Sequence, residues 1–219
     1  MNKLKVEFVA ALLALASGVT AYANPSVSDV TMTQDAATKQ VTITYVLAGD
    51  PGIVTVDIQT NAGANAWASI GARHFRSVAG AVNALVSTLG ENKIVWNPSA
   101  DWADHDQASG KVRAEVKVWP TNAPPNYMVV DLHSPSSQRL RYFEREDLLP
   151  GGLFANPEYR TTAMVFRRVP ATGMTVMLGE KEGVPGRQTD KSEDLHQVSF
   201  GHDWYAAVFE TTQAQWAMV

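Results

Sequence analysis

Residues 41–58 read Val-Thr-Ile-Thr-Tyr-Val-Leu-Ala-Gly-Asp-Pro-Gly-Ile-Val-Thr-Val-Asp-Ile, and they give the clearest structural signal in the chain. Apolar residues recur at every second position on both sides of the turn signal at residues 49–52. A period of two places one set of side chains on a core face and the other towards water. β-Branched residues, which suit a pleated surface, dominate both runs. The stretch therefore predicts two strands separated by a turn.

The same pattern continues on both sides of this stretch. Further strand candidates, separated by turn signals such as Asn97-Pro98, lie at residues 28–32, 94–96, 112–118 and 127–132. We expect the last of these to close the sheet, whereas residues 79–89 fit either a pair of strands or a short helix. Several short strands with no long helix predict a mostly β fold. They favour a β-sandwich of immunoglobulin or fibronectin type over residues 24–132.

Composition excludes several classes of protein. The chain has 219 residues, 45% hydrophobic and 18% charged, which is ordinary for a globular protein and unlike a disordered or collagen-like chain. The net charge is -4 and the basic residues form no block, which argues against nucleic acid as the main partner. There is no cysteine, so the chain offers no disulfide, no thiolate nucleophile and no cysteine ligand for a metal.

The N-terminus has the organisation of a secretory signal peptide. Lys3 and Lys5 precede an apolar run at residues 8–16, and Ala21-Tyr22-Ala23 supplies a small-x-small cleavage pattern. The run is shorter than the roughly 20 apolar residues of a spanning helix, and no later stretch is apolar enough to span a membrane. A buried N-terminal helix is the alternative. We expect residues 1–23 to be a signal peptide and the protein to be secreted or periplasmic.

Some polar and aromatic residues of the β region could be taken for a site. Asp101, Asp104, His105 and Asp106 are close enough in sequence to suggest a calcium loop, but their spacing matches no EF-hand, which favours a solvated loop. A sugar-stacking platform could come from Trp67, Trp96, Trp102 and Trp119. Trp96 and Trp119 fall at strand ends, which favours packing at the edge of the core. His74 has no partner nearby in sequence and is given no role.

The composition changes after residue 120. Six of the eleven prolines lie within residues 120–160, together with Gly151-Gly152. Proline lacks a backbone donor and is excluded from central strands. We therefore expect the domain boundary here, with a Pro/Gly-rich linker over residues 133–159 that contains a short polar or helical piece around residues 139–149.

Residues 160–219 predict two strands, at 164–169 and 174–178, around a turn at 171–173. A polar loop follows, and Thr212 with Gln215 three residues later fits a capping box that starts a helix. Because that helix has only begun at Val219, we expect this region to be an incomplete domain, less well supported than the sandwich.

Five short motifs occur in order in this last region. They are Arg168-Val169-Pro170-Ala171, Met177-Leu178-Gly179, Gly186-Arg187, His196-Gln197-Val198 and Glu210-Thr211-Thr212-Gln213-Ala214-Gln215-Trp216. In order and approximate spacing they resemble the opening of the formylglycine-generating enzyme family, also called the sulfatase-modifying factor family. The departures, at Thr172-Gly173, Leu178 and Thr211, touch no chemistry. Residues 127–132 and 151–153 also look like the linker that follows a signal peptide and sandwich in some secreted bacterial members.

The resemblance implies that residues 160–219 are the start of an α+β, C-type-lectin-like domain. For the full-length protein it implies oxidation of a sulfatase cysteine to formylglycine, with copper held by cysteines beyond this opening segment. Since this chain has no cysteine, no catalytic, cofactor-binding or metal-ligating residue is carried over, and the fragment itself is expected to be inactive. A non-catalytic extracytoplasmic binding or structural protein with the same fold is the alternative.

Two histidines in this region invite a metal hypothesis. His196 and His202 are six residues apart, and Asp203 follows the second. Two histidines without a third ligand do not make an open metal site, which favours a structural interpretation of both. If the region nevertheless hosted a catalytic site, His196, His202 and Asp203 would be the first residues to test.

The signal-peptide hypothesis fixes the mature N-terminus. Export should remove two lysines and one glutamate, so the mature chain should begin at Asn24 and carry a net charge of -5 instead of -4. Intact-mass measurement of the chain recovered from the periplasm or medium of a bacterial host checks this, with Ala23→Arg as the matched variant that should block cleavage. Recovery of the chain with Met1 still attached would contradict the hypothesis.

Overall fold

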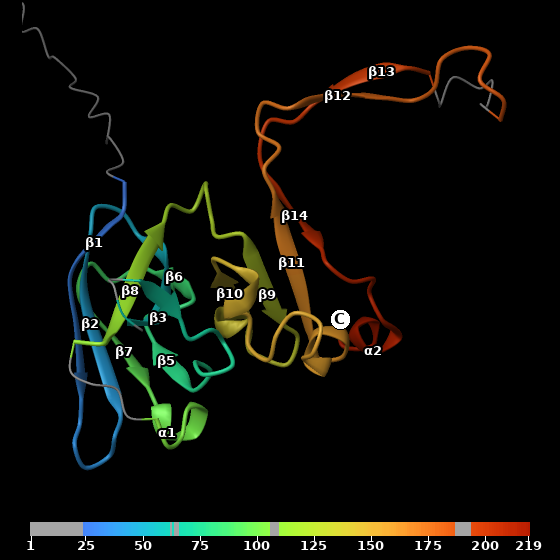
Figure 1. Cartoon of the computed structure of the whole chain (residues 1–219). Helices are drawn as coiled ribbons and strands as arrows, with labels where there is room; N and C mark the ends of the chain where they lie inside the picture. Colours follow the sequence, from blue (N-terminus) through green and yellow to red (C-terminus); the bar gives the residue numbers. More distant parts are fainter. Residues whose placement is uncertain (1–23, 62, 64–65, 106–109, 187–193) are drawn as a thin grey trace, which may run out of the picture.

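The computed structural model describes residues 24–61, 63, 66–105, 110–186 and 194–219. Over these residues the protein is mostly β, with several antiparallel sheets and few helices, as the sequence predicts (Figure 1). The predicted signal peptide, residues 1–23, lies outside the described residues. None of the described helices has the length and apolar character needed to cross a bilayer.

Two of the sheets form what we call the two-sheet unit. Sheet A contains, in spatial order, β1 (Ser26–Gln34), β2 (Val41–Ala48), β7 (Gly90–Trp96) and β5 (Val78–Gly80). Sheet B is built on β3 (Gly52–Asn61), which pairs with β4 (Trp67–Ser69), β6 (Ala84–Val86) and β8 (Val112–Trp119). The strands β2 and β3, although adjacent in sequence, therefore belong to different sheets.

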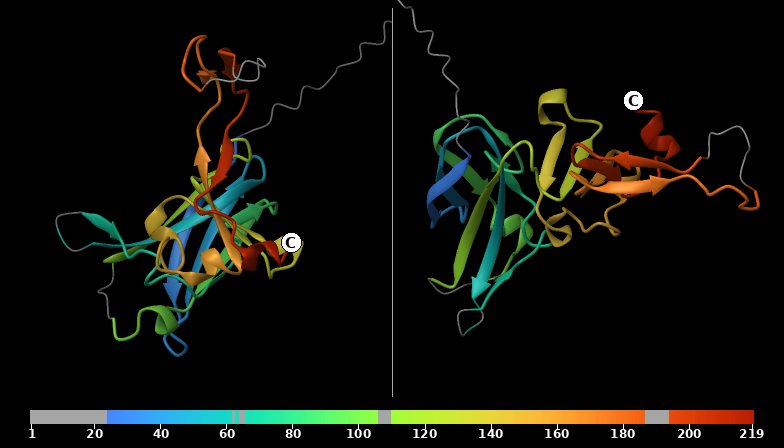
Figure 2. Two further views of the ribbon diagram at one scale, coloured as in Figure 1. Left: turned by 90° about the vertical axis from the view of Figure 1, so that its right-hand side faces the viewer. Right: turned by 90° about the horizontal axis from the view of Figure 1, so that it is seen from above.

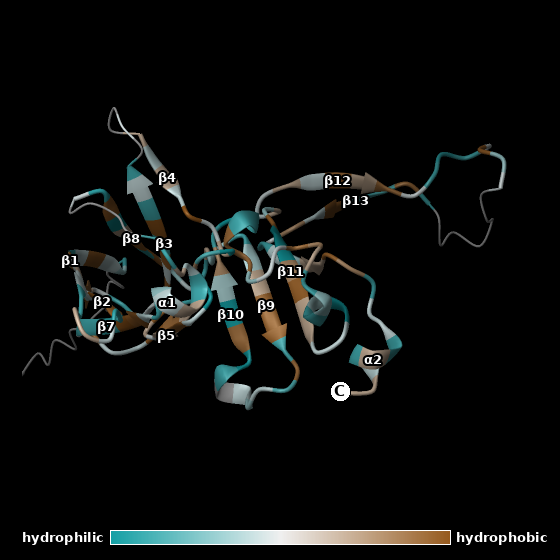
Figure 3. Ribbon diagram, turned by 60° about the horizontal axis from the view of Figure 1, so that its bottom comes forward, coloured by the Kyte–Doolittle hydropathy of each residue, from teal (hydrophilic) through white to brown (hydrophobic). Residues whose placement is uncertain are grey.

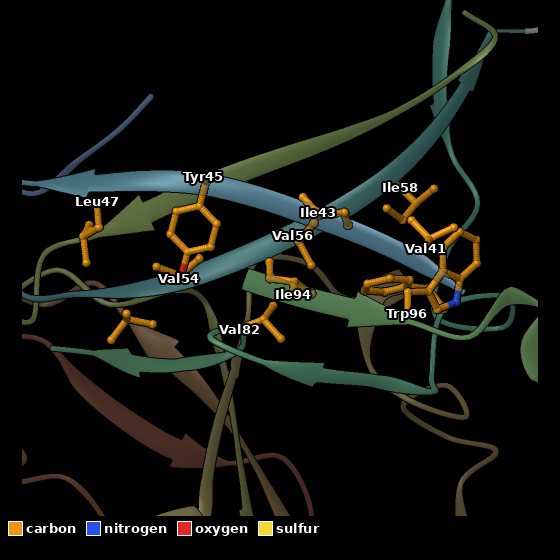
Figure 4. Packing of buried hydrophobic residues seen from close by; sticks show 12 residues of the cluster. Val41, Ile43, Tyr45, Leu47, Val54, Val56, Ile58, Val82, Ile94 and Trp96 are labelled. Atoms are coloured by element: carbon orange, nitrogen blue, oxygen red, sulfur yellow. The ribbon is translucent and has the colours of Figure 1, made fainter. Parts of the chain in front are cut away.

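One hydrophobic cluster lies between sheets A and B. The alternate apolar residues of β2 point into it, and Val54, Val56 and Ile58 of β3 meet them from the other sheet (Figure 4). Trp96 packs edge-on against Phe75, with ring centroids 5.5 Å apart. The prediction from the alternation in residues 41–58 is confirmed, because one face of each strand is buried in the core.

The segment from residue 78 to residue 86 passes from one sheet to the other. β5 pairs with β7 in sheet A, and β6 pairs with β3 in sheet B, so the ambiguous residues 79–89 form two strands that do not pair with each other. Gly80 has a φ of 101°, and a Cβ at this position would collide with the carbonyl oxygen of Lys93. Only glycine fits where this crossing begins.

A third sheet, sheet C, follows the two-sheet unit. It contains, in spatial order, β10 (Leu140–Phe143), β9 (Tyr127–Asp131), β11 (Ala163–Val169) and β14 (Trp204–Ala207). The expectation that residues 127–132 close the sandwich sheet is wrong, because β9 pairs with β10 and β11 only. The prolines at 120, 124 and 125 remove backbone donors between β8 and β9, so the chain leaves sheet B before β9 begins.

Residues 133–159, expected as a linker, fold against sheet C. They form β10 and three short 3₁₀ helices, η1 (Ser136–Gln138), η2 (Glu146–Leu148) and η3 (Pro157–Arg160). They also supply much of a second hydrophobic cluster, which includes Phe143, Leu149 and Tyr159 together with Val129 and Val165 of sheet C. β9 and β11, which carry brown apolar segments in Figure 3, lie side by side and contribute to this cluster. Because these side chains are buried, the segment is part of a core as well as a connection.

The last strands leave this core. β12 (Thr175–Leu178) pairs with β13 (His196–Ser199), and this hairpin extends away from the other sheets in every view (Figures 1 and 2). The predicted strands at 164–169 and 174–178 therefore exist but pair with other partners. The predicted capping box is confirmed: Thr212 precedes α2 (Gln213–Trp216), its hydroxyl accepts from the Gln215 backbone, and the Gln215 side chain accepts from the Thr212 backbone.

The hydrophobic cluster between sheets A and B predicts which apolar residues stabilise the two-sheet unit. Ile58→Ala should lower the free energy of unfolding by about 2–5 kcal/mol, because it leaves a cavity between the sheets. Leu89→Ala, at a leucine that is 51% exposed, should change it by less than about 0.5 kcal/mol. Urea unfolding followed by circular dichroism measures both variants. Equal losses would show that residues 41–58 do not enclose the principal core.

Candidate functional site

The Asp101 carboxylate is the centre of a hydrogen-bonded turn. It ends α1 (Pro98–Asp101) and accepts from the backbone N–H groups of Arg76 and Ser77, both at 2.6 Å. The Ser77 hydroxyl donates at 2.8 Å and the Trp96 indole at 3.1 Å. All four donors bind this one carboxylate. Its role is therefore structural, because it connects residues 76–77 to α1 beside the core.

The remaining residues of the acidic loop are arranged differently. Asp104 and His105 are exposed, and Asp106 lies outside the described residues. Trp102 stacks on His105 with ring centroids 4.5 Å apart, and on His74 with centroids 5.4 Å apart. His74, to which the sequence assigned no role, therefore belongs to an aromatic cluster. Within the part of the chain that the structure describes, no three carboxylate or imidazole groups are placed to hold a metal ion.

The four candidate tryptophans do not share one surface. Trp96 is buried in the core, and the indole N–H of Trp119 donates to the Thr55 hydroxyl at 3.0 Å. Trp67 lies under the Arg113 guanidinium, 4.4 Å from its ring centroid, and Trp102 stacks on both His74 and His105. Each indole has a different partner within the protein, which supports packing roles over a shared stacking platform.

A buried ion pair joins the two-sheet unit to sheet C. Asp57, on the outward face of β3, is only 3% exposed. Its carboxylate accepts from Arg145 at 3.1 Å and from the Ser69 hydroxyl at 2.5 Å. Arg145 also pairs with Asp147 at 3.0 Å, and the hydrogen bond to Asp147 contributes most to raising the pKa of the guanidinium. Sheet B gives this buried carboxylate hydrogen-bond donors but no cation, and Arg145 supplies the opposite charge.

Further polar contacts surround this ion pair. Lys117 of β8 donates to Glu144 at 2.9 Å, and the Tyr142 backbone N–H donates to the Asn83 carbonyl at 2.8 Å. Gln59, also buried, accepts from Arg113 and donates to Glu115 at 3.0 Å. We call this set the polar junction. Every side chain of the polar junction has a hydrogen-bond or ion-pair partner within the protein. This favours a structural role for the polar junction.

The largest of the described cavities lies where β11, β14 and the 121–126 loop meet. It has a volume of about 470 Å³ and is lined by Thr121, Asn122, Pro124, Arg168, Thr172, Gly201, His202, Asp203, Trp204 and Tyr205. Two of the sequence-predicted residues, His202 and Asp203, are therefore in one cavity. His196 begins β13, where its Nδ1 lies 2.8 Å from the Asp194 carbonyl oxygen.

Asp203 organises one wall of this cavity. Its Oδ1 accepts from the backbone N–H groups of Ala171 and Thr172, each at 3.0 Å, and from the Thr172 hydroxyl at 2.7 Å. The backbone hydrogen bond from Thr172 is the main cause that holds the pKa of Asp203 below its ordinary value. Its Oδ2 faces Arg168 Nε at 3.5 Å. Asp203 is thus an anion beside a cation, with one oxygen largely uncommitted.

Arg168 and Tyr205 line the cavity beside Asp203. The Arg168 Nη1 donates to the Pro124 carbonyl, and the Tyr205 hydroxyl donates to the Pro125 carbonyl. Burial raises the pKa of Tyr205, so it remains a neutral donor. Among the described residues, Arg168 Nε is the only buried side-chain nitrogen or oxygen with no hydrogen bond. Sequence reasoning did not single out Arg168 or Trp204 for this cavity. The position of Trp204 directly after His202 and Asp203 was a signal for it, whereas Arg168 is brought there only by the pairing of β11 with β14.

A second, smaller cavity of about 320 Å³ lies on sheet C and includes Asp131, Arg141 and Tyr159. Asp131 is committed to its own turn, where it accepts from the Ser134 hydroxyl at 2.7 Å. Burial raises the pKa of Tyr159 to about 12, and its hydroxyl donates to the Pro150 carbonyl at 2.9 Å. Both groups therefore stabilise the fold around this cavity.

Comparison of the chain with protein-family models, with curated proteins and with solved structures finds no match.

The Asp101 turn predicts a specific pH dependence. Partial burial raises the pKa of Asp101, but the hydrogen bonds from Ser77, Arg76 and Trp96 outweigh it and the net pKa lies below the ordinary 3.8. A lowered folded-state pKa contributes stability above pH 3.8 that is lost as the pH falls through the folded value. Asp101→Asn should therefore destabilise the protein by about 1 kcal/mol or more near neutral pH, and by less at about pH 3.

Urea midpoints of wild type and Asp101→Asn at the two pH values measure this effect. The matched control is Asp104→Asn, at an exposed aspartate of the same loop, which should behave as the wild type at both. A difference between Asp101→Asn and wild type that stays constant with pH would mean that the ionised carboxylate does not stabilise the turn.

Proposed function

We propose that this chain is the amino-terminal part of an exported protein of the formylglycine-generating enzyme family. In this proposal residues 24–132 are a β-sandwich of immunoglobulin or fibronectin type, ahead of a connecting segment at 133–159. Residues 160–219 open an α+β, C-type-lectin-like domain. The intact protein would be secreted or periplasmic and would oxidise a cysteine of a partner sulfatase to formylglycine.

The observation that carries the proposal is the position of the last motif. Gln215 is 2% exposed, and its amide donates to the carbonyls of Tyr159 at 3.1 Å and Ala163 at 2.6 Å. The Thr212 hydroxyl donates to the Arg160 carbonyl at 2.9 Å. The threonine and glutamine of the motif thus anchor α2 to the start of β11. The polar residues of the last motif therefore join the end of residues 160–219 to their beginning. This supports the interpretation that the five motifs belong to one domain.

The turn after the first motif supports the same proposal. Pro170 and Ala171 follow β11, and Asp203, which lies beyond the fourth motif, binds the Ala171 backbone at 3.0 Å. The second and fourth motifs also lie opposite each other, because Met177 and Leu178 of β12 pair with Gln197 and His196 of β13. Segments of this region that are distant in sequence are therefore held together, which supports a single folded unit for the ordered set.

The residues present do not fit a copper(I) site of the kind that the family implies. Copper(I) prefers soft thiolate or thioether ligands, and the thiolates that the resemblance calls for are missing because the chain has no cysteine. We therefore assign no catalytic step to these 219 residues. Paired cysteines in the reading frame beyond residue 219 would favour the oxidase.

A second candidate function is a non-catalytic extracytoplasmic binding protein with the same fold. The observation that favours it is the cavity beside Arg168 and Trp204, which these residues build without any cysteine. Absence of cysteines from the rest of the reading frame would favour this candidate over the oxidase.

The proposal predicts how activity divides between this chain and a longer one. The 219-residue chain, with or without added copper, should not convert a sulfatase-derived cysteine peptide to the aldehyde, because it offers no thiolate ligand. A longer product of the same reading frame that carries paired cysteines should convert it. Mass spectrometry of the peptide, which shows the aldehyde as a loss of sulfur, measures both reactions against a blank of copper alone.

Two results would contradict this division. Conversion by the 219-residue chain above the copper blank would place a site within it, and alanine substitution at His196, His202 and Asp203 would locate that site. Failure of a longer, cysteine-containing chain would remove the oxidase and leave the binding protein.

A further inference from the structure

The cavity between β11, β14 and the 121–126 loop has polar groups that the fold does not use. Arg168 Nη1 donates to the Pro124 carbonyl, and the Arg168 backbone N–H donates to the Asn126 carbonyl. Arg168 Nη2 donates no hydrogen bond to any of the described residues. Asp203 Oδ1 accepts three hydrogen bonds, whereas Oδ2 has only the 3.5 Å contact with Arg168 Nε. A donor and an acceptor of opposite charge are therefore left side by side.

This pairing selects against simple ions. A carboxylate or phosphate that approached Arg168 would be repelled by Asp203, and an ammonium group that approached Asp203 would be repelled by Arg168. A hydroxyl group has one donor and two acceptor lone pairs, so it can donate to Asp203 Oδ2 and accept from Arg168 at the same time. The arrangement therefore favours a neutral ligand with several hydroxyl groups.

Trp204 adds a flat apolar surface to the same cavity. It is 44% exposed although it lies within a strand, and its register partner is Val169 at the end of β11. An indole presents an apolar face while its N–H remains available to water or a ligand. The other polar lining residues include Thr121, Asn122 and His202, which provide further hydrogen-bonding groups.

We propose that this cavity binds a neutral saccharide. One face of a sugar ring, with its C–H groups, stacks on Trp204, and adjacent hydroxyl groups bridge Arg168 and Asp203. The volume of about 470 Å³ lies within the range of small-molecule sites, about 300–1,000 Å³. The inference does not depend on the proposed family, because every residue that it uses lies within this chain.

The experiment follows the tryptophan indole N–H signals of the ¹⁵N-labelled chain during titration with neutral disaccharides. The probes are maltose, cellobiose, lactose and di-N-acetylchitobiose. Glucose is titrated as a neutral monosaccharide, and glucuronate and glucosamine serve as charged probes that differ from it by one group. The chain has six tryptophans, so the Trp204 signal is assigned by its disappearance in Trp204→Ala. The matched control is Trp216→Ala, which removes a tryptophan that is 78% exposed and does not line the cavity.

At least one neutral disaccharide should shift the Trp204 signal in a saturable way. Trp204→Ala should weaken its binding by at least about tenfold, or ~1.4 kcal/mol, whereas Trp216→Ala should change it by no more than about twofold. Glucuronate and glucosamine should bind more weakly than glucose. Unchanged circular dichroism and melting temperature of Trp204→Ala would exclude unfolding as the cause.

Three results would overturn the proposal. The first is the absence of any shift at Trp204 with all four disaccharides at about 10 mM, which would place any affinity below a useful range. The second is unchanged binding in a folded Trp204→Ala. The third is tighter binding of either charged probe than of glucose, which would assign the cavity to ionic ligands.

Discussion

The Asp57 carboxylate is buried on the outer face of β3, and the position of the second half of the molecule follows from that burial. A carboxylate removed from water is costly unless it is paired and hydrogen bonded. Arg145 and Ser69 provide the partners, and Arg145 comes from the segment between β10 and the rest of sheet C. β3 is therefore covered on both faces, by the hydrophobic cluster on one side and by the polar junction on the other. The two-sheet unit and sheet C pack against each other because β3 requires both coverings.

The sequence predicts the parts of the fold that local physics controls. The alternation at residues 41–58 depends only on which face of each strand is buried, and the Thr212–Gln215 capping box depends only on residues within one turn. The partner of a strand is a different matter. Residues 127–132 have a strand pattern, but their pairing with β11 is set by the prolines before them and by the second hydrophobic cluster. Pairing between strands that are distant in sequence leaves no periodic pattern or local motif in a single sequence.

The candidate site shows the same limit. Asp203 was singled out because it follows His202, but its partners are Ala171, Thr172 and Arg168, more than thirty residues earlier in the chain. Trp204 was not among the four tryptophans that were considered as a stacking platform, and those four lie on separate segments of the chain. The sequence placed His202 and Asp203 together as neighbours, but it gave no sign of the distant residues that line the cavity with them. Only the register of β11 with β14 brings Arg168 next to Tyr205 and Val169 next to Trp204.

The prolines that end the two-sheet unit also explain why a cavity forms where it does. Proline removes the N–H of a residue but keeps its carbonyl, so the 120–126 segment has acceptors that no neighbouring strand can satisfy. Arg168 and Tyr205 provide the missing donors to Pro124, Pro125 and Asn126. The Arg168 and Tyr205 side chains reach the carbonyls of this segment from a distance that leaves room for a cavity. A continuous row of backbone hydrogen bonds would have brought the two segments together and left no cavity. The exit from sheet B, the anchoring of β11 and the cavity beside Trp204 are therefore consequences of the same backbone constraint.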